Sequence, residues 1–324
     1  MKPKNLKAIR VFTQVSFFIL FCVAPTFNLL RFDLDEGHFY LLTLNWSIGI
    51  GEDLPAGQLA LNMLFYGVVP VVALLIGGFY LFYKFGRIYC GWLCPHFSVV
   101  EMVNRYLSKA IGKVSIWDKS PLPKVRADGS IRDKSLWWWL VVVPLAISMA
   151  FLWSVVLIGY VIDPFDVFRD LSNMTLSFTK TIFLIAGTTI LSLEFLFARH
   201  LFCRFGCAFG MFQSLAWMAN RKGLLISFDK SKSAQCKSCD NHCDHACPMR
   251  LKPRGMKRHM FSCTQCTQCL MACDIAQKGN PVLSWKPDDS NDKNSVAIPI
   301  AFYSKDTNPA DRTTTKQRKN GTLD

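Results

Sequence analysis

Charge is absent from three long stretches of this sequence. No Asp, Glu, Lys or Arg occurs in residues 11–30, 54–83 or 135–162, although the chain carries 37 basic and 23 acidic residues in all. Such runs exclude a water-exposed conformation, and they are long enough to cross a bilayer as helices, which takes about 20 residues. A fourth and weaker run, residues 176–198, contains one Lys and one Glu. The sequence therefore predicts four membrane-spanning helices.

A signal-peptide cleavage pattern is also missing. The first apolar run follows a basic start but lacks a small-x-small motif, so it is predicted to remain as an uncleaved anchor. Basic residues are scarce in the loops 31–58 and 162–179 and abundant at the N-terminus and in the loop 101–135. The positive-inside rule then puts both termini and the 84–135 loop in the cytoplasm. Because topology accounts for the net charge of +14, nucleic-acid binding is not expected.

The motif for c-type haem attachment, Cys-x-x-Cys-His, does not occur, and the cysteines are not spread along the chain as in a disulfide framework. Twelve of the thirteen cysteines instead fall in tight groups, which favours metal binding. The exception is Cys22 in the first apolar run, which is interpreted as a small packing residue of a membrane helix.

Two cysteine runs dominate the polar part of the chain after Gly223. The second, CTQCTQCLMACD, has the Cys-x2-Cys-x2-Cys-x3-Cys spacing that holds a cubane 4Fe–4S cluster, and the first, CKSCDNHCDHACPM, is closely similar. In two-cluster ferredoxins the fourth cysteine of each run binds the cluster of the other run. Zinc is the alternative, but it would not require such regular spacing of the third and fourth cysteines. The runs therefore predict one cluster on Cys236, Cys239, Cys243 and Cys273, and a second cluster on Cys263, Cys266, Cys269 and Cys247.

Both runs depart slightly from the usual pattern. The first has one extra residue before Cys243, and the second has Asp274 where proline is usual. His242 and His245 are expected to face solvent, since four cysteines are already available. Basic residues near the runs are interpreted as a surface resting on anionic lipid, in preference to a docking patch for an acidic redox partner. These residues are Lys237, Arg250, Lys252, Arg254, Lys257 and Arg258.

Two further cysteine pairs follow the second and fourth apolar runs. Residues 86–105 and 199–221 each contain Cys-x3-Cys, an apolar stretch and Asn-Arg, which indicates an internal duplication. On a helix, i, i+4 spacing puts both sulfurs of a pair on one face. Four such thiols suit copper(I) or a thiolate-bound cluster, and a pair can also cycle between dithiol and disulfide. The thiols are those of Cys90, Cys94, Cys203 and Cys207, and the neighbouring candidate ligands are His96, His200 and Met211.

These features predict the fold class and the domain organisation. Residues 1–219 are predicted to form an all-α transmembrane bundle of four helices with both termini inside. Residues 220–287 are predicted to form a small α+β, ferredoxin-like domain that carries two 4Fe–4S clusters in the cytoplasm. The polar residues 288–324 are predicted to be a disordered tail.

The order of these motifs resembles the membrane polyferredoxins that act as accessory proteins of cbb3-type cytochrome c oxidases (the CcoG/RdxA/FixG type). NapH-type quinol dehydrogenase subunits and regulators of nitrous oxide reduction are more distantly similar. Ala208 stands where the accessory family has proline, and the immunoglobulin-like domain into which that family continues does not follow in this sequence. The resemblance covers about residues 10–290, and it is carried by RFDLDEGHFYLLTLNW, GRIYCGWLCP, CRFGCAFGMFQS and the ending Cys273-Asp274.

The resemblance implies electron transfer at a bacterial inner membrane, with redox proteins or quinol as partners. In the oxidase-accessory group it implies copper reduction for assembly of the oxidase, and in the NapH-type group it implies transfer from quinol towards a respiratory reductase. The leading hypothesis is therefore an integral membrane electron carrier of the oxidoreductase type. Glu194 is the candidate acid of a quinol site, since it is the one acidic residue well inside an apolar run. A non-enzymatic copper(I)-handling assembly factor is the alternative from a different class.

Overall fold

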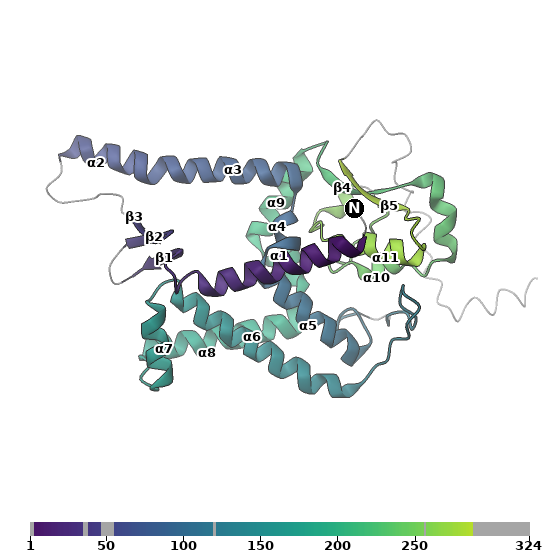
Figure 1. Ribbon diagram of the computed structural model, residues 1–324, viewed down its shortest axis with the longest axis horizontal. Coiled ribbons are helices and arrows are strands. Elements are labelled where there is room, and N and C mark those ends of the chain that lie inside the picture. The colour runs from purple at the N-terminus through teal and green to yellow at the C-terminus, as the bar shows by residue number, and fades with distance from the viewer. Residues whose placement is uncertain (1–2, 35–37, 47–54, 119–120, 256, 288–324) are drawn as a thin grey trace, which may run out of the picture.

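The computed structural model of the chain describes residues 3–34, 38–46, 55–118, 121–255 and 257–287 (Figure 1). The predicted tail, residues 288–324, lies outside the described residues, as do residues 35–37 and 47–54 of the first predicted outer loop.

Among the described residues, four apolar helices are long enough to cross a membrane, as the three charge-free runs and the weaker fourth run predict. Two of them continue through a π-helical turn, and a third begins with a 3-10 turn. The predicted direction in which they cross a membrane stays a prediction. The helices are α1 (Pro3–Val23), α2 (Ala56–Asn62) with the π turn Met63–Val68 and α3 (Val69–Phe85), α6 (Trp139–Gly159) after the 3-10 turn Leu136–Trp138, and α8 (Phe178–Leu193) with the π turn Glu194–Ala198.

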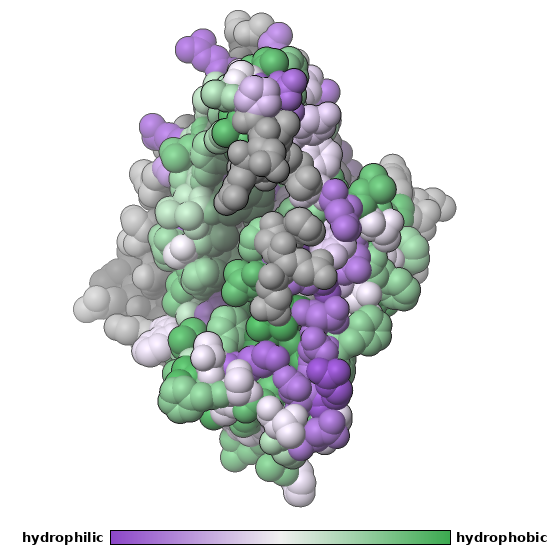
Figure 2. All heavy atoms as spheres, turned by 90° about the vertical axis from the view of Figure 1, so that its left-hand side faces the viewer, coloured by the Kyte–Doolittle hydropathy of each residue, from purple (hydrophilic) through white to green (hydrophobic). Residues whose placement is uncertain are grey.

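The four spans do not pack as a single bundle. Helix α6 packs on α8, and the amphipathic helix α5 (Pro95–Ile111) adds Val100, Val103 and Leu107 to the same core. Helix α3 has no buried residue and contacts instead α9 (Ala208–Ala219), standing apart from α1, α6 and α8 (Figure 1). Seen from the left-hand side of Figure 1, the surface carries many apolar side chains next to a band of hydrophilic ones (Figure 2).

The first predicted outer loop contains a sheet, so the membrane part is not all-α as expected. Strands β1 (Leu30–Asp33), β2 (His38–Leu41) and β3 (Leu44–Trp46) pair antiparallel in that order. The tight turn between β2 and β3 is made by Leu42 and Thr43 at φ values of 50° and 65°. Hairpin turns of this kind usually carry Asn or Gly, and the absence of that signal hides the sheet in the sequence.

Arg31, the single basic residue of that loop, is an internal ion-pair partner. Its side chain is 4 % exposed and contacts Asp33 at 2.5 Å and Asp163 at 3.3 Å. Asp163 in turn caps the short helix α7 (Pro164–Ser172) by accepting the Phe165 backbone N–H at 2.8 Å. The two loops at this end of the spans are therefore joined by one buried guanidinium.

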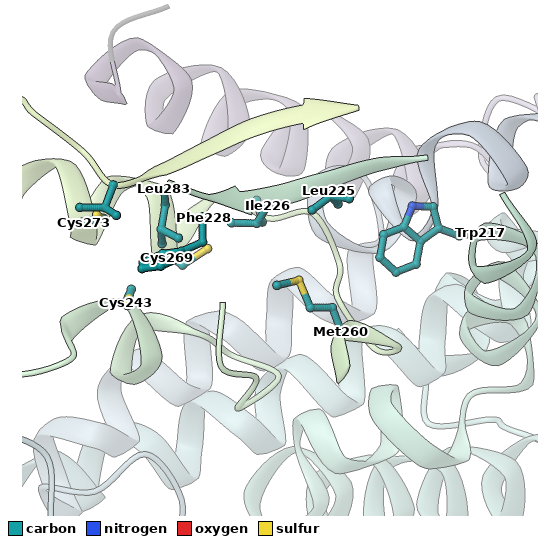
Figure 3. Packing of buried hydrophobic residues seen from close by; sticks show 10 residues of the cluster. Trp217, Leu225, Ile226, Phe228, Cys243, Met260, Cys269, Cys273 and Leu283 are labelled. Atoms are coloured by element: carbon teal, nitrogen blue, oxygen red, sulfur yellow. The ribbon is translucent and has the colours of Figure 1, made fainter. Parts of the chain in front are cut away.

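The residues after α9 form the predicted small α+β region. Strands β4 (Leu224–Phe228) and β5 (Leu283–Pro287) pair antiparallel. Between them lie the 3-10 helix Lys230–Ser238, α10 (His242–Ala246), the 3-10 turn Lys257–Met260 and α11 (Gln268–Ala276). Their buried core includes Cys243, Cys269 and Cys273 beside Phe228 and Leu283, with Trp217 of α9 at its far end (Figure 3). The predicted domain limit at residue 219 therefore adjoins a shared core, and the limit itself stays a prediction.

Replacing Arg31 by Met is expected to lower the free energy of unfolding by about 3 kcal/mol or more, because it removes the buried guanidinium from its ion pair with the Asp33 carboxylate. The midpoint of thermal unfolding of the detergent-solubilised protein measures this loss. Arg169→Met is the matched control, since it breaks an exposed pair with Asp166 and is expected to cost less than about 1 kcal/mol. Equal losses in the two variants would contradict the assigned role of Arg31.

Candidate functional site

The structure brings the eight cysteines of the two runs together in two sets of four. Cys236, Cys239, Cys243 and Cys273 line one small cavity, whose wall also includes Phe228 and Leu283. Cys247, Cys263, Cys266 and Cys269 line a second cavity, closed by Met249, Leu251 and Met260 among others. Each set takes three cysteines from one run and the fourth from the other, which is the exchange that the spacing predicts.

These cavities are poor places for free thiolates. Burial raises the pKa of Cys247 and Cys263 to about 12 and also raises the pKa of Cys243 and Cys269, and the neighbouring sulfurs add to the shift. A bound metal reverses this preference, because its positive charge stabilises the deprotonated sulfur. Four convergent thiols within an apolar wall thus fit an iron–sulfur cluster.

The extra residue in the first run is absorbed before the helix that carries its third cysteine. Asn241 precedes α10 with φ 53°, and Thr267 precedes α11 with φ 60°, so both helices begin from the same left-handed cap. Cys243 and Cys269 each follow that cap by two residues. The inserted residue therefore lies upstream, in the link from Cys239 to the cap, and leaves the helix geometry unchanged.

The two Cys-x3-Cys pairs have equivalent local structures. Cys90 lies in the short helix α4 (Ile88–Trp92), and Cys203 lies in the π turn Phe202–Gly206. Their partners Cys94 and Cys207 cap the N-termini of α5 and α9. The structure thus supports an internal duplication of the predicted kind.

Gly86 and Arg199 occupy matching positions, four residues before the first cysteine of each pair. Gly86 has φ 65° and ψ −139°, and Arg199 has φ 53° and ψ −130°. Glycine adopts this conformation readily, whereas a side chain makes it costly by about 1–3 kcal/mol. The second half of the chain therefore carries an arginine at a position whose backbone favours glycine.

Three cysteines of these pairs, Cys90, Cys203 and Cys207, lie near a buried cation. The guanidinium of Arg87, 2 % exposed, donates to the Cys203 carbonyl oxygen at 2.9 Å and to the Ser214 hydroxyl oxygen at 2.5 Å. Burial lowers the pKa of Arg87, and negative charge on Cys90, Cys207 or Cys203 opposes that shift. Burial also raises the pKa of Cys90 to about 12. Arg87 is thus placed to stabilise thiolates in this set.

An apolar bridge joins the membrane-side thiols to the second cavity. Phe97, Met249 and Leu251 are buried together, and four cysteines pack around them. Two of these cysteines come from the membrane-side pairs and two from the set that lines the second cavity. They are Cys94, Cys203, Cys247 and Cys263.

The second cysteine run, which begins at Cys263, also packs directly against α4. A Cβ atom on Gly91 would collide with the Thr264 carbonyl oxygen and crowd the Cys266 backbone at 3.2 Å. The Trp92 indole N–H donates to the Gln265 carbonyl oxygen at 3.0 Å, and Arg10 of α1 donates to the Gly91 carbonyl oxygen at 2.9 Å. This contact fixes the cluster-type run against the first Cys-x3-Cys pair.

Glu194 and His96 meet beside the same thiols. The Glu194 Oε1 and His96 Nε2 atoms are 3.1 Å apart, while Oε2 of the same carboxylate is buried without a hydrogen-bond partner in the described part of the chain. The imidazole is enclosed by the rings of Trp153, Phe195 and Phe202. The predicted acid is therefore part of a carboxylate–imidazole pair in an aromatic environment.

The remaining candidate ligands have other surroundings. His200 stacks on Phe97 at 4.9 Å between ring centroids, Met211 is 36 % exposed, and His245 is exposed whereas His242 is half-buried. Across the described residues, no three His, Cys, Asp or Glu side chains are arranged to hold a single metal ion. Thiols around a cluster lie farther apart than thiols around one ion, because the cluster fills the space between them.

The basic residues near the runs do not form one free surface patch. Arg254 is 7 % exposed and contacts Asp244 at 2.6 Å, and Arg250 contacts Asp118 at the same distance. Lys257 lies over the Trp217 ring and donates to the Asn220 carbonyl oxygen. Three of the six residues assigned to a lipid or partner surface are thus used inside the protein.

Comparison with known families finds one match. The family described as a 4Fe-4S binding domain matches residues 65–113 and 180–224, that is, both halves that contain a Cys-x3-Cys pair. The same family fits twice, which agrees with the duplication. Cysteine spacing predicts 4Fe–4S clusters at the two later runs and leaves copper(I), a cluster or a disulfide open for the Cys-x3-Cys pairs. The family match falls on the halves that contain these pairs.

Several known proteins are similar over much of the chain. An uncharacterized protein of Methanocaldococcus jannaschii is 25 % identical over 269 residues, which is 83 % of this chain and 93 % of that protein. YccM of Escherichia coli, named as an electron transport protein, is 24 % identical over 73 % of this chain and 59 % of its own length. The regulatory protein NosR of Stutzerimonas stutzeri is 24 % identical over 65 % of this chain but only 27 % of NosR. No solved structure matches.

Gly91→Ala is expected to loosen the contact between α4 and the second cysteine run, because the added methyl group collides with the backbone at Thr264. Overpacking of this kind costs about 1–3 kcal/mol. Limited proteolysis after Gly223 is expected to become at least several-fold faster in this variant. Gly77→Ala is the control, since a Cβ atom there meets nothing within 4 Å. Unchanged proteolysis of Gly91→Ala would contradict the tight docking.

Proposed function

We propose that this chain is a membrane electron-transfer protein that holds two 4Fe–4S clusters in its C-terminal region. The observation that carries the proposal is the grouping of eight cysteines into two cavities of four. The similarity to a 4Fe-4S binding domain and to YccM supports the same chemistry. Such clusters exchange single electrons when bound. The first set would be Cys236, Cys239, Cys243 and Cys273, and the second Cys247, Cys263, Cys266 and Cys269.

The chain's own residues would provide a dry environment and a defined route. Met249 and Leu251 exclude water from the second cavity. Together with Phe97 they form the single layer of side chains between this cavity and Cys94 and Cys203. Electrons would pass between the C-terminal clusters and the membrane-side thiols along this bridge. Arg87 would offset the negative charge of those thiols.

The contacts at the start of α1 support the predicted topology. Arg10 pairs with Glu101 of α5, and Gln268 of α11 donates to the same carboxylate at 2.5 Å. The start of the first span and the C-terminal region thus lie together, whereas β1–β3 and α7 lie at the opposite ends of the spans (Figure 1). We propose that the C-terminal region faces the cytoplasm of a bacterial inner membrane, in line with the distribution of basic residues.

Copper reduction for assembly of a respiratory oxidase is a finer proposal that rests on the resemblance alone. No described group of side chains is arranged for a single ion, so copper would have to arrive as cargo at the four membrane-side thiols. The similarity of both halves to a 4Fe-4S binding domain instead favours iron–sulfur chemistry at Cys90, Cys94, Cys203 and Cys207.

The proposal is tested by metal analysis of the anaerobically purified full chain. We expect about eight irons and eight sulfides per chain from two clusters, or about twelve if the membrane-side thiols also hold a cluster. Cys263→Ser and Cys236→Ser are each expected to remove about four irons and one set of electron paramagnetic resonance signals. Cys22→Ser is the control and is expected to change neither quantity. An iron-free, zinc-loaded protein would overturn the proposal.

A second candidate function, quinol oxidation, is favoured by the Glu194–His96 pair. A quinol releases two protons when it is oxidised, so its site needs proton acceptors in an apolar environment. The unpartnered Oε2 atom of Glu194 and the aromatic rings around His96 meet this need beside Cys203.

If that site operates, Glu194→Gln is expected to slow oxidation of a soluble quinol by about 100-fold, the usual scale for losing a general base. Reduction of the clusters by dithionite should stay unchanged, which separates quinol chemistry from cluster assembly. Asp166→Asn, an exposed acid on α7, serves as the control. Wild-type rates in Glu194→Gln would reject the quinol assignment and leave the cluster assignment intact.

A further inference from the structure

A large cavity adjoins the second cysteine cavity, with which it shares Cys247 and Met249. Its volume is about 770 Å³, within the range of sites for small organic ligands. The walls come from the start of α1, one face of α5, the loop 114–132, the turn after α8 and the segments 245–250 and 268–275. Cys247 is the one cysteine in its wall. The cavity thus lies beside the second cysteine set without being part of it.

Positive charge dominates this cavity. Eight basic and three acidic side chains line it, the acids being Glu101, Asp128 and Asp274. Arg10 is neutralised by Glu101 and Arg250 by Asp118. The other six basic residues form no ion pair among the residues that the structure describes. They are Lys7, Arg105, Arg126, Arg132, Arg199 and Arg204.

Arg199 is the buried centre of this group. It is 5 % exposed, one of its guanidinium nitrogens donates to the Val114 carbonyl oxygen, and Nη1 has no partner. Nη1 of Arg132 and Nδ1 of the buried His200, both in the same wall, also lack partners among the described residues. A buried guanidinium nitrogen left without a hydrogen-bond acceptor is costly, and a bound anion removes that cost.

We propose that this cavity binds a phosphate-bearing organic ligand. Several arginine side chains that outnumber the carboxylates in the same wall match a phosphate, which can accept from more than one guanidinium at once. Val11, Leu122 and Ile275 add apolar wall for the organic part of the ligand. The same chemistry is offered by a mononucleotide and by the head group of an anionic phospholipid.

The backbone conformation of Arg199 suggests a substitution that removes its charge without straining the main chain. Arg199 has the conformation of Gly86 in the other half of the chain, so Arg199→Gly removes the buried cation while relieving backbone strain. Arg126→Gln/Arg132→Gln is an independent variant in another segment of the cavity wall. Lys124→Gln/Lys134→Gln removes the same number of charges from the same loop outside the cavity wall.

The experiment is calorimetric titration of the full chain in neutral detergent with inorganic phosphate, AMP, dioctanoyl phosphatidylglycerol and dioctanoyl phosphatidylcholine. We expect saturable binding of about one phosphate-bearing anion per chain. We also expect a Kd raised at least tenfold by Arg199→Gly and by Arg126→Gln/Arg132→Gln, and unchanged by Lys124→Gln/Lys134→Gln. Binding of phosphate and AMP would identify a soluble ligand, and binding of phosphatidylglycerol alone would identify a lipid head group.

Absence of saturable binding by all three anionic probes would overturn the proposal. So would equal affinity for phosphatidylcholine, or wild-type affinity in both cavity variants. Iron content is measured on the same samples. Because none of the substituted residues belongs to a cysteine set, loss of anion binding with full iron content would leave the electron-transfer proposal standing.

Discussion

The close approach of the second cysteine run to Gly91 is the constraint on which the rest of this arrangement depends. Because Gly91 has no side chain, the backbone from Thr264 to Cys266 lies directly on α4. The contact falls at a residue between Cys90 and Cys94. That contact brings the C-terminal cavity within one apolar layer of the membrane-side thiols. A bulkier residue at position 91 would separate two groups of thiols whose proximity is the basis of the proposed electron route.

The two halves of the internal duplication have equivalent backbone conformations before their Cys-x3-Cys pairs, but they carry different side chains there. Gly86 and Arg199 share one strained conformation, yet only the second places a cation in the large cavity. The next residue differs as well, since Arg87 turns inwards among the thiols whereas His200 stacks on Phe97. One half thus provides charge for the sulfurs, and the other provides charge for an anion site.

The sequence predicts those features that depend on local spacing. Three runs without charge and a fourth with only two charged residues identify the four spans, and cysteine spacing groups Cys247 with Cys263 rather than with Cys243. Features that depend on contacts between distant segments were missed. The sheet in the first loop lacks a turn signal at Leu42 and Thr43, and neither Arg87 nor Gly91 stands out before the two halves are folded together. The available signal for Arg87 was its position shortly after an apolar span, next to the first Cys-x3-Cys pair.

Metal loading and the docking of the C-terminal region are physically coupled in this arrangement. Cys263 and Cys266 belong to the run that contacts Gly91 and Trp92, so the loop that would wrap a cluster is also the loop that docks. Buried thiols with raised pKa values gain no charge stabilisation without metal, and the free energy of metal binding contributes to folding in such sites. The docked geometry, and with it the bridge through Phe97 and Met249, would therefore be most stable when the second cysteine set is loaded.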